Sequence, residues 1–250
     1  MEPTNEQPHL LSYEQAYQFY EYLLEERSDL NAQLQAKKNA LVVLDANYDP
    51  WFEFKFPLPY PPIEGEDDNT ESPEDYFNKI STTLPDYLML LIQAGSAALG
   101  YFEEGEMSNH KVVRKYMIRK KQGKFQGSHL KTKGKSKYGS RVRLNNTLEF
   151  FEDINQKLED WEIVDEVDRI LYFASIPLWN MMFESKIPCP FEKEDARLRR
   201  IPKDVQIPHY DELLRINTFA QSGWVHIYQP IDLEEFFESI QPQELDDDEW

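Results

Sequence analysis

The sequence has a single cysteine, Cys189, so the chain cannot form an internal disulfide or supply a pair of thiolates for zinc. We therefore expect a reducing compartment and place the protein in the cytoplasm. The longest apolar run, residues 88–102, contains two glycines and is shorter than the roughly 20 residues that span a bilayer. The first ten residues lack the basic and apolar regions of a secretory signal. These absences predict a soluble protein.

Acidic residues are absent from residues 107–148, although the chain as a whole is strongly acidic. The full sequence has 27 Lys and Arg against 46 Asp and Glu, a net charge of −19. Thirteen of the 27 basic residues lie in residues 107–148, which leaves 14 for the rest of the chain. Such a split favours binding of a polyanion in one orientation, because the acidic remainder repels RNA everywhere else.

Residues 1–85 are expected to hold a helix, two strands and a linker. Leucines and tyrosines at mostly helical spacing predict a helix over 12–38, capped by Ser12 and Gln15. Residues 40–44 and 51–56 are predicted strands, followed by a proline-rich and acidic linker over 57–75.

Residues 86–230 show the alternation of strands and helices that is typical of an α/β domain. Asn146 is expected to cap a helix over 145–161, with Glu149 at its third position. That helix has an apolar stripe of Leu148, Phe151, Ile154, Leu158 and Trp161. We expect a three-stranded meander and then a crossover. The other predicted elements are strands over 87–94, 96–106, 110–119 and 169–175, helices over 178–185 and 208–223, and a strand or helix extension over 224–228. Residues 231–250 are read as an acidic, solvated tail.

Residues 119–141, RKKQGKFQGSHLKTKGKSKYGSR, combine basic side chains with four of the nine glycines. Gly123 and Gly127 are expected hinges on either side of Gln126, and Gly134 and Gly139 also permit sharp turns. A glutamine does not titrate, but it can hold a water molecule, and its backbone N–H can face an oxyanion. A lysine-rich loop with no catalytic role fits this composition equally well. The basic residues that we expect to contact RNA are Arg114, Arg119, Lys120, Lys121, Lys124, Lys131, Lys133, Lys135, Lys137, Arg141 and Arg143, and Lys111 and Lys115 carry the same charge.

The stretch KVVRKYMIRKKQGKFQGSH resembles the catalytic segment of the release-factor-like domain in ankyrin-repeat and zinc-finger peptidyl-tRNA hydrolases, which are relatives of eukaryotic and archaeal class 1 release factors. In that family, an R-Y-x-x-R strand leads into K-Q-G and a glutamine three residues after the glycine. The segments SRVRLNNTLEFFEDINQKLEDW and EDARLRRIPKDVQIPHYDELLRI extend the resemblance over residues 86–228. The chain looks like a bacterial-type member without zinc finger or ankyrin repeats. The corresponding positions are Arg114, Tyr116 (one residue further on than in the family pattern), Arg119, Lys121, Gln122, Gly123 and Gln126.

The resemblance implies a release-factor middle-domain fold, which is related to the ribonuclease H-like architecture, with a mixed sheet and flanking helices. It also implies an enzyme that acts on stalled ribosomes and frees nascent chains by cleaving peptidyl-tRNA, at the ester or within the tRNA 3′ end. The implied partners are the large ribosomal subunit, peptidyl-tRNA and rRNA, with no cofactor. Gln126 is the residue that this resemblance makes catalytic.

The sequence departs from the family immediately before Gln126. Lys124 and Phe125 stand where the closer relatives have glycine and serine, which restricts the backbone there. Ester hydrolysis requires Gln126 to orient a water molecule. Phosphodiester cleavage by the tRNA 2′-hydroxyl requires a base and a cation, for which His129, Arg119 and Arg141 are the nearest candidates. Both reactions remain open, as does a non-catalytic module that binds rRNA or tRNA.

The other histidines and carboxylates give no pattern of metal ligands. His9, His110, His209 and His226 lack metal-like spacing, so structural or surface roles are expected and no metal is predicted. The carboxylates Asp165, Glu166 and Asp168 are expected to lie in a turn before a strand rather than in a ribonuclease H-like metal cluster.

Overall fold

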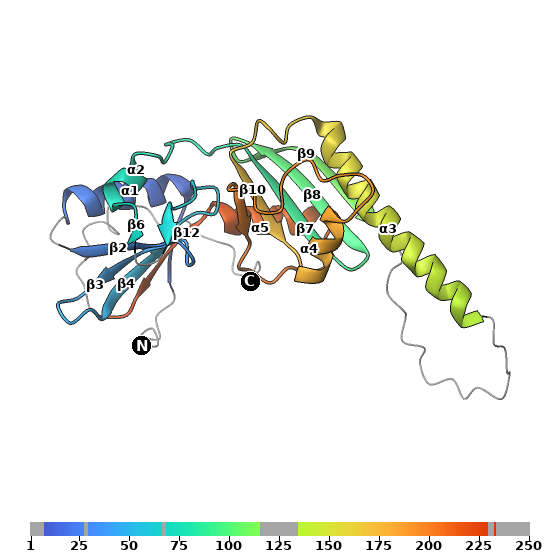
Figure 1. Ribbon diagram of the computed structural model, residues 1–250. Coiled ribbons are helices and arrows are strands. Elements are labelled where there is room, and N and C mark those ends of the chain that lie inside the picture. Colours follow the sequence, from blue (N-terminus) through green and yellow to red (C-terminus); the bar gives the residue numbers. More distant parts are fainter. Residues whose placement is uncertain (1–7, 28–29, 67–68, 116–134, 230–232, 234–250) are drawn as a thin grey trace. The chain divides into compact units, whose positions relative to one another are not determined.

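The computed structural model describes residues 8–27, 30–66, 69–115, 135–229 and 233, with residues 135–145 described by their backbone alone. The chain forms two compact units, each with its own sheet (Figure 1). The first unit comprises residues 1–87, 102–106 and 214–250, and the second comprises residues 88–101 and 107–213.

The sheet of the first unit takes strands from both ends of the chain. Its order is β1-β12-β4-β3-β2, and all neighbours are antiparallel. Strand β12 lies between β1 and β4, with Trp224 opposite both Leu10 and Lys55. The sheet is therefore complete only with a strand that lies about 170 residues after its neighbour β4. The strands are β1 (His9–Leu11), β2 (Asn31–Gln35), β3 (Ala40–Leu44), β4 (Pro50–Lys55) and β12 (Gly223–Ile227).

Aromatic side chains form the core of the first unit. Helix α1 (Tyr13–Glu25) buries Phe19 and Tyr20 against alternate residues of β4, and the Phe19 and Phe54 rings meet edge to face at 5.0 Å. The Tyr20 hydroxyl donates to the Pro73 carbonyl at 2.8 Å, and burial raises the pKa of Tyr20 well above its ordinary value. Buried tyrosines of this kind keep their hydroxyls hydrogen-bonded while the rings supply apolar area.

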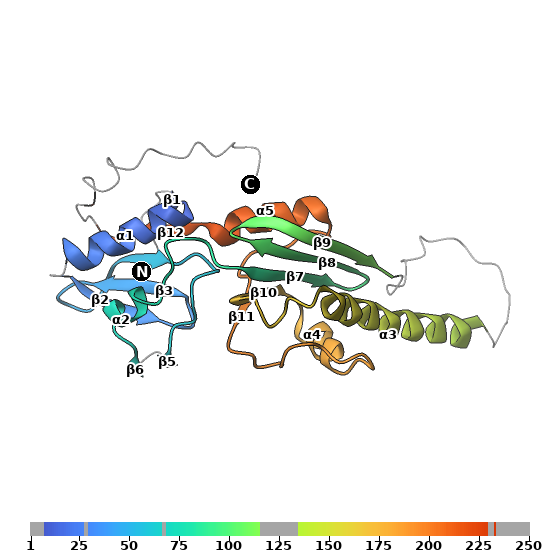
Figure 2. The same ribbon diagram turned by 90° about the horizontal axis from the view of Figure 1, so that it is seen from above.

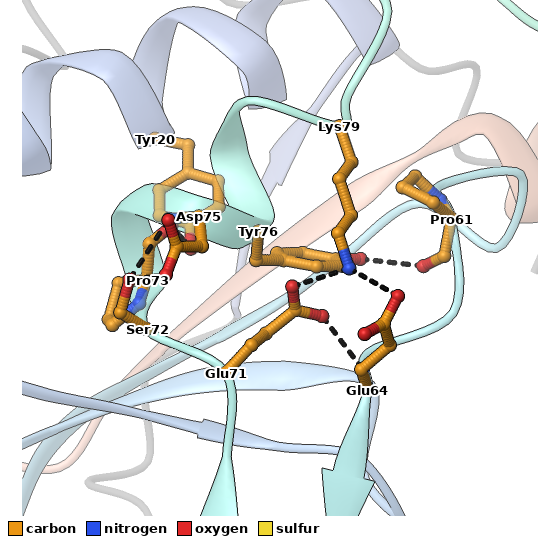
Figure 3. A network of polar contacts seen from close by, with 9 residues as sticks. All are labelled: Tyr20, Pro61, Glu64, Glu71, Ser72, Pro73, Asp75, Tyr76 and Lys79. Carbon is orange, nitrogen blue, oxygen red and sulfur yellow. Dashed lines mark hydrogen bonds and ion pairs between the residues drawn. The ribbon is translucent and has the colours of Figure 1, made fainter.

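An ion-pair network holds the segment that precedes and includes α2 (Pro73–Phe77). In Figure 3 the Lys79 ammonium lies between the carboxylates of Glu64 and Glu71, at 2.7 and 2.6 Å. The Tyr76 hydroxyl donates to the Pro61 carbonyl at 2.9 Å. The segment that we expected to be an open linker over 57–75 is thus tied down at several points, and it contains the short hairpin β5 (Gly65–Glu66) and β6 (Asn69–Thr70).

The helix predicted over 12–38 is wrong in its second half. The capping box of Ser12 and Gln15 is confirmed, but α1 ends at Glu25 and residues 31–35 form β2. On β2 the side chains of Ala32 and Leu34 both face the core, because residues two positions apart on a strand lie on the same face. Spacing alone did not separate this short strand from a continued helix.

The second sheet has the order β11-β10-β7-β8-β9. The meander β7-β8-β9 is confirmed, and so is the crossover, since α3 connects β9 to β10 and β10 lies next to β7. Strands β10 and β11 are parallel, so the mixed α/β class is confirmed. The elements are β7 (Tyr87–Gln93), β8 (Ser96–Glu103), β9 (Glu106–Arg114), α3 (Lys135–Trp161), β10 (Arg169–Phe173), α4 (Ile176–Phe183), β11 (Leu198–Arg200) and α5 (Tyr210–Gln221).

Helix α3 covers the core of the second unit with its second half. Phe150, Phe151, Ile154 and Leu158 are buried there with side chains of β7 and β8. The predicted stripe is confirmed at Phe151, Ile154 and Leu158, and Trp161 is partly buried against the same core, but Leu148 is 42% exposed. Asn146 does not cap the helix, because α3 begins eleven residues earlier at Lys135. In the part of the chain that the structure describes, no helix is long and apolar enough to cross a membrane.

Candidate nucleic-acid interface

Residues 116–134, called the basic segment below, come in the chain between an edge strand and a long helix of the second unit. Strand β9 is the last strand of its sheet and ends at Arg114, and the next described element is α3. The predicted catalytic residues Gln126 and His129 and the hinges Gly123 and Gly127 lie outside the described residues. So do six of the predicted RNA-binding residues, Arg119, Lys120, Lys121, Lys124, Lys131 and Lys133.

The first half of α3 extends beyond the sheet, as both views show (Figures 1 and 2). Among residues 146–161 of α3, whose side chains the structure describes, the first buried one is Phe150, fifteen positions after Lys135, which corresponds to roughly 22 Å at 1.5 Å per residue. The four basic residues that we expected on a loop here are helical instead: Lys135, Lys137, Arg141 and Arg143. Gly139 is also helical and makes no turn, although glycine costs about 1 kcal/mol relative to alanine inside a helix.

Lys115 joins the end of β9 to α3. Its backbone N–H donates to the Gly95 carbonyl at 3.0 Å, and its ammonium lies 3.0 Å from Asp153 and 3.3 Å from Glu149. The two carboxylates are one helical turn apart and face the same neighbour. The hydrogen bond to Asp153, followed by that to Glu149, raises the pKa of Lys115. Lys115 is therefore held by acidic partners, while Arg114 beside it is exposed.

Sequence reasoning missed an aromatic pair beside this segment. His110 on β9 is exposed, and its ring centroid lies 4.8 Å from that of Tyr210 at the start of α5. No sequence pattern links these residues, because they are one hundred positions apart. The only sequence signal was that both residues are aromatic and border segments that carry the family resemblance.

The carboxylates near residue 165 lie in a turn, as predicted. The Arg197 guanidinium donates to the carbonyls of Val164 at 2.6 Å and Val167 at 3.1 Å, and it pairs with Asp195 at 2.7 Å. Its hydrogen bond to Asp195 holds the pKa of that carboxyl below the usual range. Arg197, which directly precedes the L-R-R-I-P segment, thus stabilises the turn before β10. Among the described residues, no three His, Cys, Asp or Glu side chains gather as metal ligands.

Residues 87–227 match the model of a family of release factors. This range includes the edge strand β9, the basic segment and the helix α3. The matching family is described as the Bacteroidetes VLRF1 release factor, and because the match covers more than half of the 250 residues, the chain belongs to this family. The resemblance stated from the motif around Gln126 is confirmed at the level of the family.

Curated proteins are similar to about half of the chain or slightly more. The human tRNA endonuclease ANKZF1 is 28% identical over 148 residues, which are 58% of this chain and 20% of the relative. The Caenorhabditis elegans tRNA endonuclease vms-1 is 28% identical over 131 residues, which are 51% of this chain and 21% of the relative. The chain spans about a fifth of the length of these curated relatives. A solved structure, the Vms1 mitochondrial localization core, aligns over 76% of this chain and 77% of its own, with a TM-score of 0.44 and 12% identity.

Proposed function

We propose that this protein cleaves peptidyl-tRNA and thereby frees nascent chains from stalled ribosomes. The observation that carries the proposal is membership of the VLRF1 release factor family over the residues that hold the basic segment. The names of the relatives add that proteins similar to 51–58% of this chain are tRNA endonucleases. An enzyme of this kind uses its protein groups for positioning and charge stabilisation rather than for redox or cofactor chemistry.

The roles of the site residues follow from their chemistry. Gln126 positions the attacking group at the acceptor end of the tRNA, since its amide both accepts and donates hydrogen bonds. Phe125, which stands where the closer relatives have serine, stacks on a terminal base. Basic residues on both sides, including Arg114, Lys135 and Arg141, contact phosphates and set the orientation without reading sequence.

The projecting half of α3 gives a physical reason for the arrangement. A slender element suits access to a peptidyl-tRNA bound in a ribosome, and Lys135 lies roughly 22 Å along α3 from Phe150, the first buried side chain among residues 146–161. The four basic positions from Lys135 to Arg143 lie on this extension. Because the rest of the chain is acidic, the extension is the part that RNA attracts.

The test is Gln126→Ala in the full chain, assayed with purified peptidyl-tRNA on stalled large subunits. We expect release of the nascent chain to fall roughly 10²-fold, as for the loss of one group that stabilises developing charge, while ribosome binding is unchanged. Ser128→Ala, two residues further along, is the matched control and should release the peptide normally. Normal release by the Gln126→Ala protein would refute this mechanism.

The 3′ end of the product tRNA identifies the bond that is cut. Ester hydrolysis leaves the tRNA at its full length, with a free 3′-terminal hydroxyl. Attack by a tRNA 2′-hydroxyl instead leaves a shortened tRNA that ends in a 2′,3′-cyclic phosphate, and it requires a general base such as His129. His129→Ala should therefore abolish the second reaction and spare the first.

The second candidate function is a non-catalytic module that binds rRNA or tRNA through the same segment. Lys124 and Phe125 favour it, because they replace the flexible residues that precede the glutamine in the family. This candidate predicts that the wild-type chain binds ribosomes and never shortens or deacylates the tRNA, so the assay above separates the two.

A further inference from the structure

Three hydrogen bonds gather around the turn between β7 and β8. The backbone N–H of Lys115 donates to Gly95, the Ser96 hydroxyl donates to the Pro208 carbonyl at 2.9 Å, and the Gln93 amide donates to the Val205 carbonyl at 2.7 Å. Ser96 is buried, so its bond to Pro208 is shielded from water. The residues just before α5 are thus fixed beside the point where β9 passes into the basic segment.

The first turn of α5 is held rigidly. The His209 ring accepts a hydrogen bond from the Glu212 backbone N–H at 2.9 Å, which caps the helix. The Glu212 carboxylate is buried and accepts from the Gln206 backbone N–H at 2.6 Å. Tyr210, which lies between these groups, therefore presents its ring from a fixed backbone.

The Tyr210 ring meets His110 but remains open to solvent. The ring centroids are 4.8 Å apart and the planes are inclined by 57°. Tyr210 is 43% exposed, and Ile207 beside it in the chain is 66% exposed. Two aromatic rings that only secured the fold would be expected to bury most of their surface, as the core rings Phe19, Tyr20 and Phe54 of the first unit do.

The face of β9 that holds His110 also holds an exposed cation, Arg114, at one end of the strand, and the same alternation places the exposed Glu106 on that face at the other end. Side chains two positions apart on a strand share a face, so His110, Val112 and Arg114 point to one side and the buried Val113 points to the core under α3. Arg114 lies four residues, or about 13 Å, from His110. Residues 107–148 include both side chains and contain no acid, whereas Glu106 and Asp211 are the nearest acids along the chain.

We propose that His110 and Tyr210 form a stacking site for an unpaired nucleobase of RNA, with Arg114 on the phosphate backbone of the same strand. Exposed aromatic rings stack on bases of any sequence, and adjacent basic groups neutralise the phosphates. The exposed guanidinium of Arg114 favours RNA over a neutral peptide surface, because each phosphate carries a negative charge. The inference deepens the proposed function and rests on it for RNA as the partner.

The experiment measures binding of the full chain to two short single-stranded oligoribonucleotides of equal length. One has normal bases and the other has abasic sites at its central positions, so the two share their charge. Wild-type protein should bind the normal oligonucleotide roughly 5- to 100-fold more tightly, as one or more stacked bases would give. Tyr210→Ala and His110→Ala should lose that preference, and Tyr210→Phe should keep it. Arg114→Ala should weaken both complexes alike.

Two controls keep the outcome interpretable. Tyr48→Ala removes a tyrosine that is 74% exposed on the first unit, and it should change neither affinity. Thermal unfolding of each variant verifies the fold, and the Tyr210→Phe protein tests the ring without leaving a gap. Equal affinity of the wild-type chain for both oligonucleotides would overturn the proposal, and so would retention of the preference in Tyr210→Ala.

The experiments distinguish a failure of the stacking-site proposal from a failure of the proposed function. Loss of base preference in Tyr210→Ala together with normal release of peptide would place the site on an RNA other than the substrate, and the stacking proposal would stand. A wild-type chain that prefers the normal oligonucleotide but releases no peptide would refute the enzyme and leave the stacking site intact. A wild-type chain that binds neither oligonucleotide overturns the stacking site.

Discussion

At the scale of single residues, Lys115 differs from the other basic side chains near it. The other basic residues of 107–148 have no acid close to them in the chain. The Lys115 ammonium nevertheless lies within 3.3 Å of the Glu149 and Asp153 carboxylates. The contact joins the strand that enters the basic segment to the helix that leaves it. A lysine so placed sets the spacing of the two ends and contributes little to RNA affinity.

The pair Lys115 and Asp153 should therefore be exchangeable. We expect each of Lys115→Asp and Asp153→Lys to destabilise the protein by about 0.5 kcal/mol and the double variant to recover most of the loss, because exposed ion pairs have couplings below about 1 kcal/mol. Urea unfolding of the four proteins in a double-mutant cycle measures the coupling. Lys111→Ala, on the same strand, is the control and should show no coupling to Asp153.

The pH dependence of this coupling follows from the raised pKa of Lys115. A lysine whose pKa is higher in the folded state stabilises the fold fully below its unfolded value of about 10.4, and the contribution disappears as the pH rises through the folded value. The coupling should thus be constant between pH 7 and 9 and decline above pH 10.5. A coupling that grew at high pH would contradict the ion pair.

At the residue scale, the sequence predicted which residues are candidates for RNA binding and catalysis, but it did not predict contacts between distant residues. The motif around Gln126 and the acid-free run of 13 cations are local properties, and they are readable without coordinates. The pairing of His110 with Tyr210 and of Lys115 with Asp153 depends on how distant segments meet, and periodicity holds no information on that. The structure assigns His110, which its spacing had left as an ordinary surface residue, to an exposed aromatic pair.

At the scale of elements, α3 is anchored by one buried polar side chain. Asn155 is fully buried, and its amide donates to the carbonyls of Met182 at 2.9 Å and Ile187 at 2.8 Å. These carbonyls belong to the end of α4 and the loop that follows it. The helix that projects from the sheet is therefore tied to α4 as well as to the apolar core.

Asn155→Leu should loosen this anchor. The substitution keeps the volume and leaves two carbonyls without their donor, so we expect a loss of roughly 2–4 kcal/mol in the free energy of unfolding. Gln156→Leu, at the exposed neighbouring position, is the matched control and should change stability by less than about 0.5 kcal/mol. Denaturant unfolding measures both values, and equal stability of the two variants would show that Asn155 anchors nothing.

The boundaries of elements were predictable where the pattern was strong. Buried strands such as β7 and β10 were located to within two residues, because runs of apolar residues between turns are typical of them. The start of α3 was missed because residues 135–145 are basic and contain Gly139, which is a poor helix former. The apolar stripe began only at the part of the helix that meets the core.

At the scale of the whole molecule, β12 connects the family region to the amino-terminal residues. The family match ends at residue 227, yet residues 223–227 form a strand between β1 and β4 of the first unit. Val225 on this strand is fully buried in the aromatic core of that unit. The family region therefore contributes to both units.

A fragment of residues 87–229 should consequently lose the order of β12. Without β1 and β4, the amides of Trp224 to Ile227 have no strand partners, so we expect them to exchange with solvent far faster than in the full chain. Hydrogen exchange followed by mass spectrometry measures this, with the buried β7 amides as the internal control. Equal protection of residues 224–227 in both proteins would refute the dependence.

The sequence by itself determined the separation of charge, the strand and helix periods, and the motif that places the chain in its family. Each of these depends on residues that are close together in the chain, where spacing and composition hold the information. Only the tertiary structure decided that β12 completes the amino-terminal sheet, that Lys115 is paired with α3, and that His110 meets Tyr210. These contacts join residues tens to more than a hundred positions apart, and their free energy exists only once the apolar core has brought the segments together.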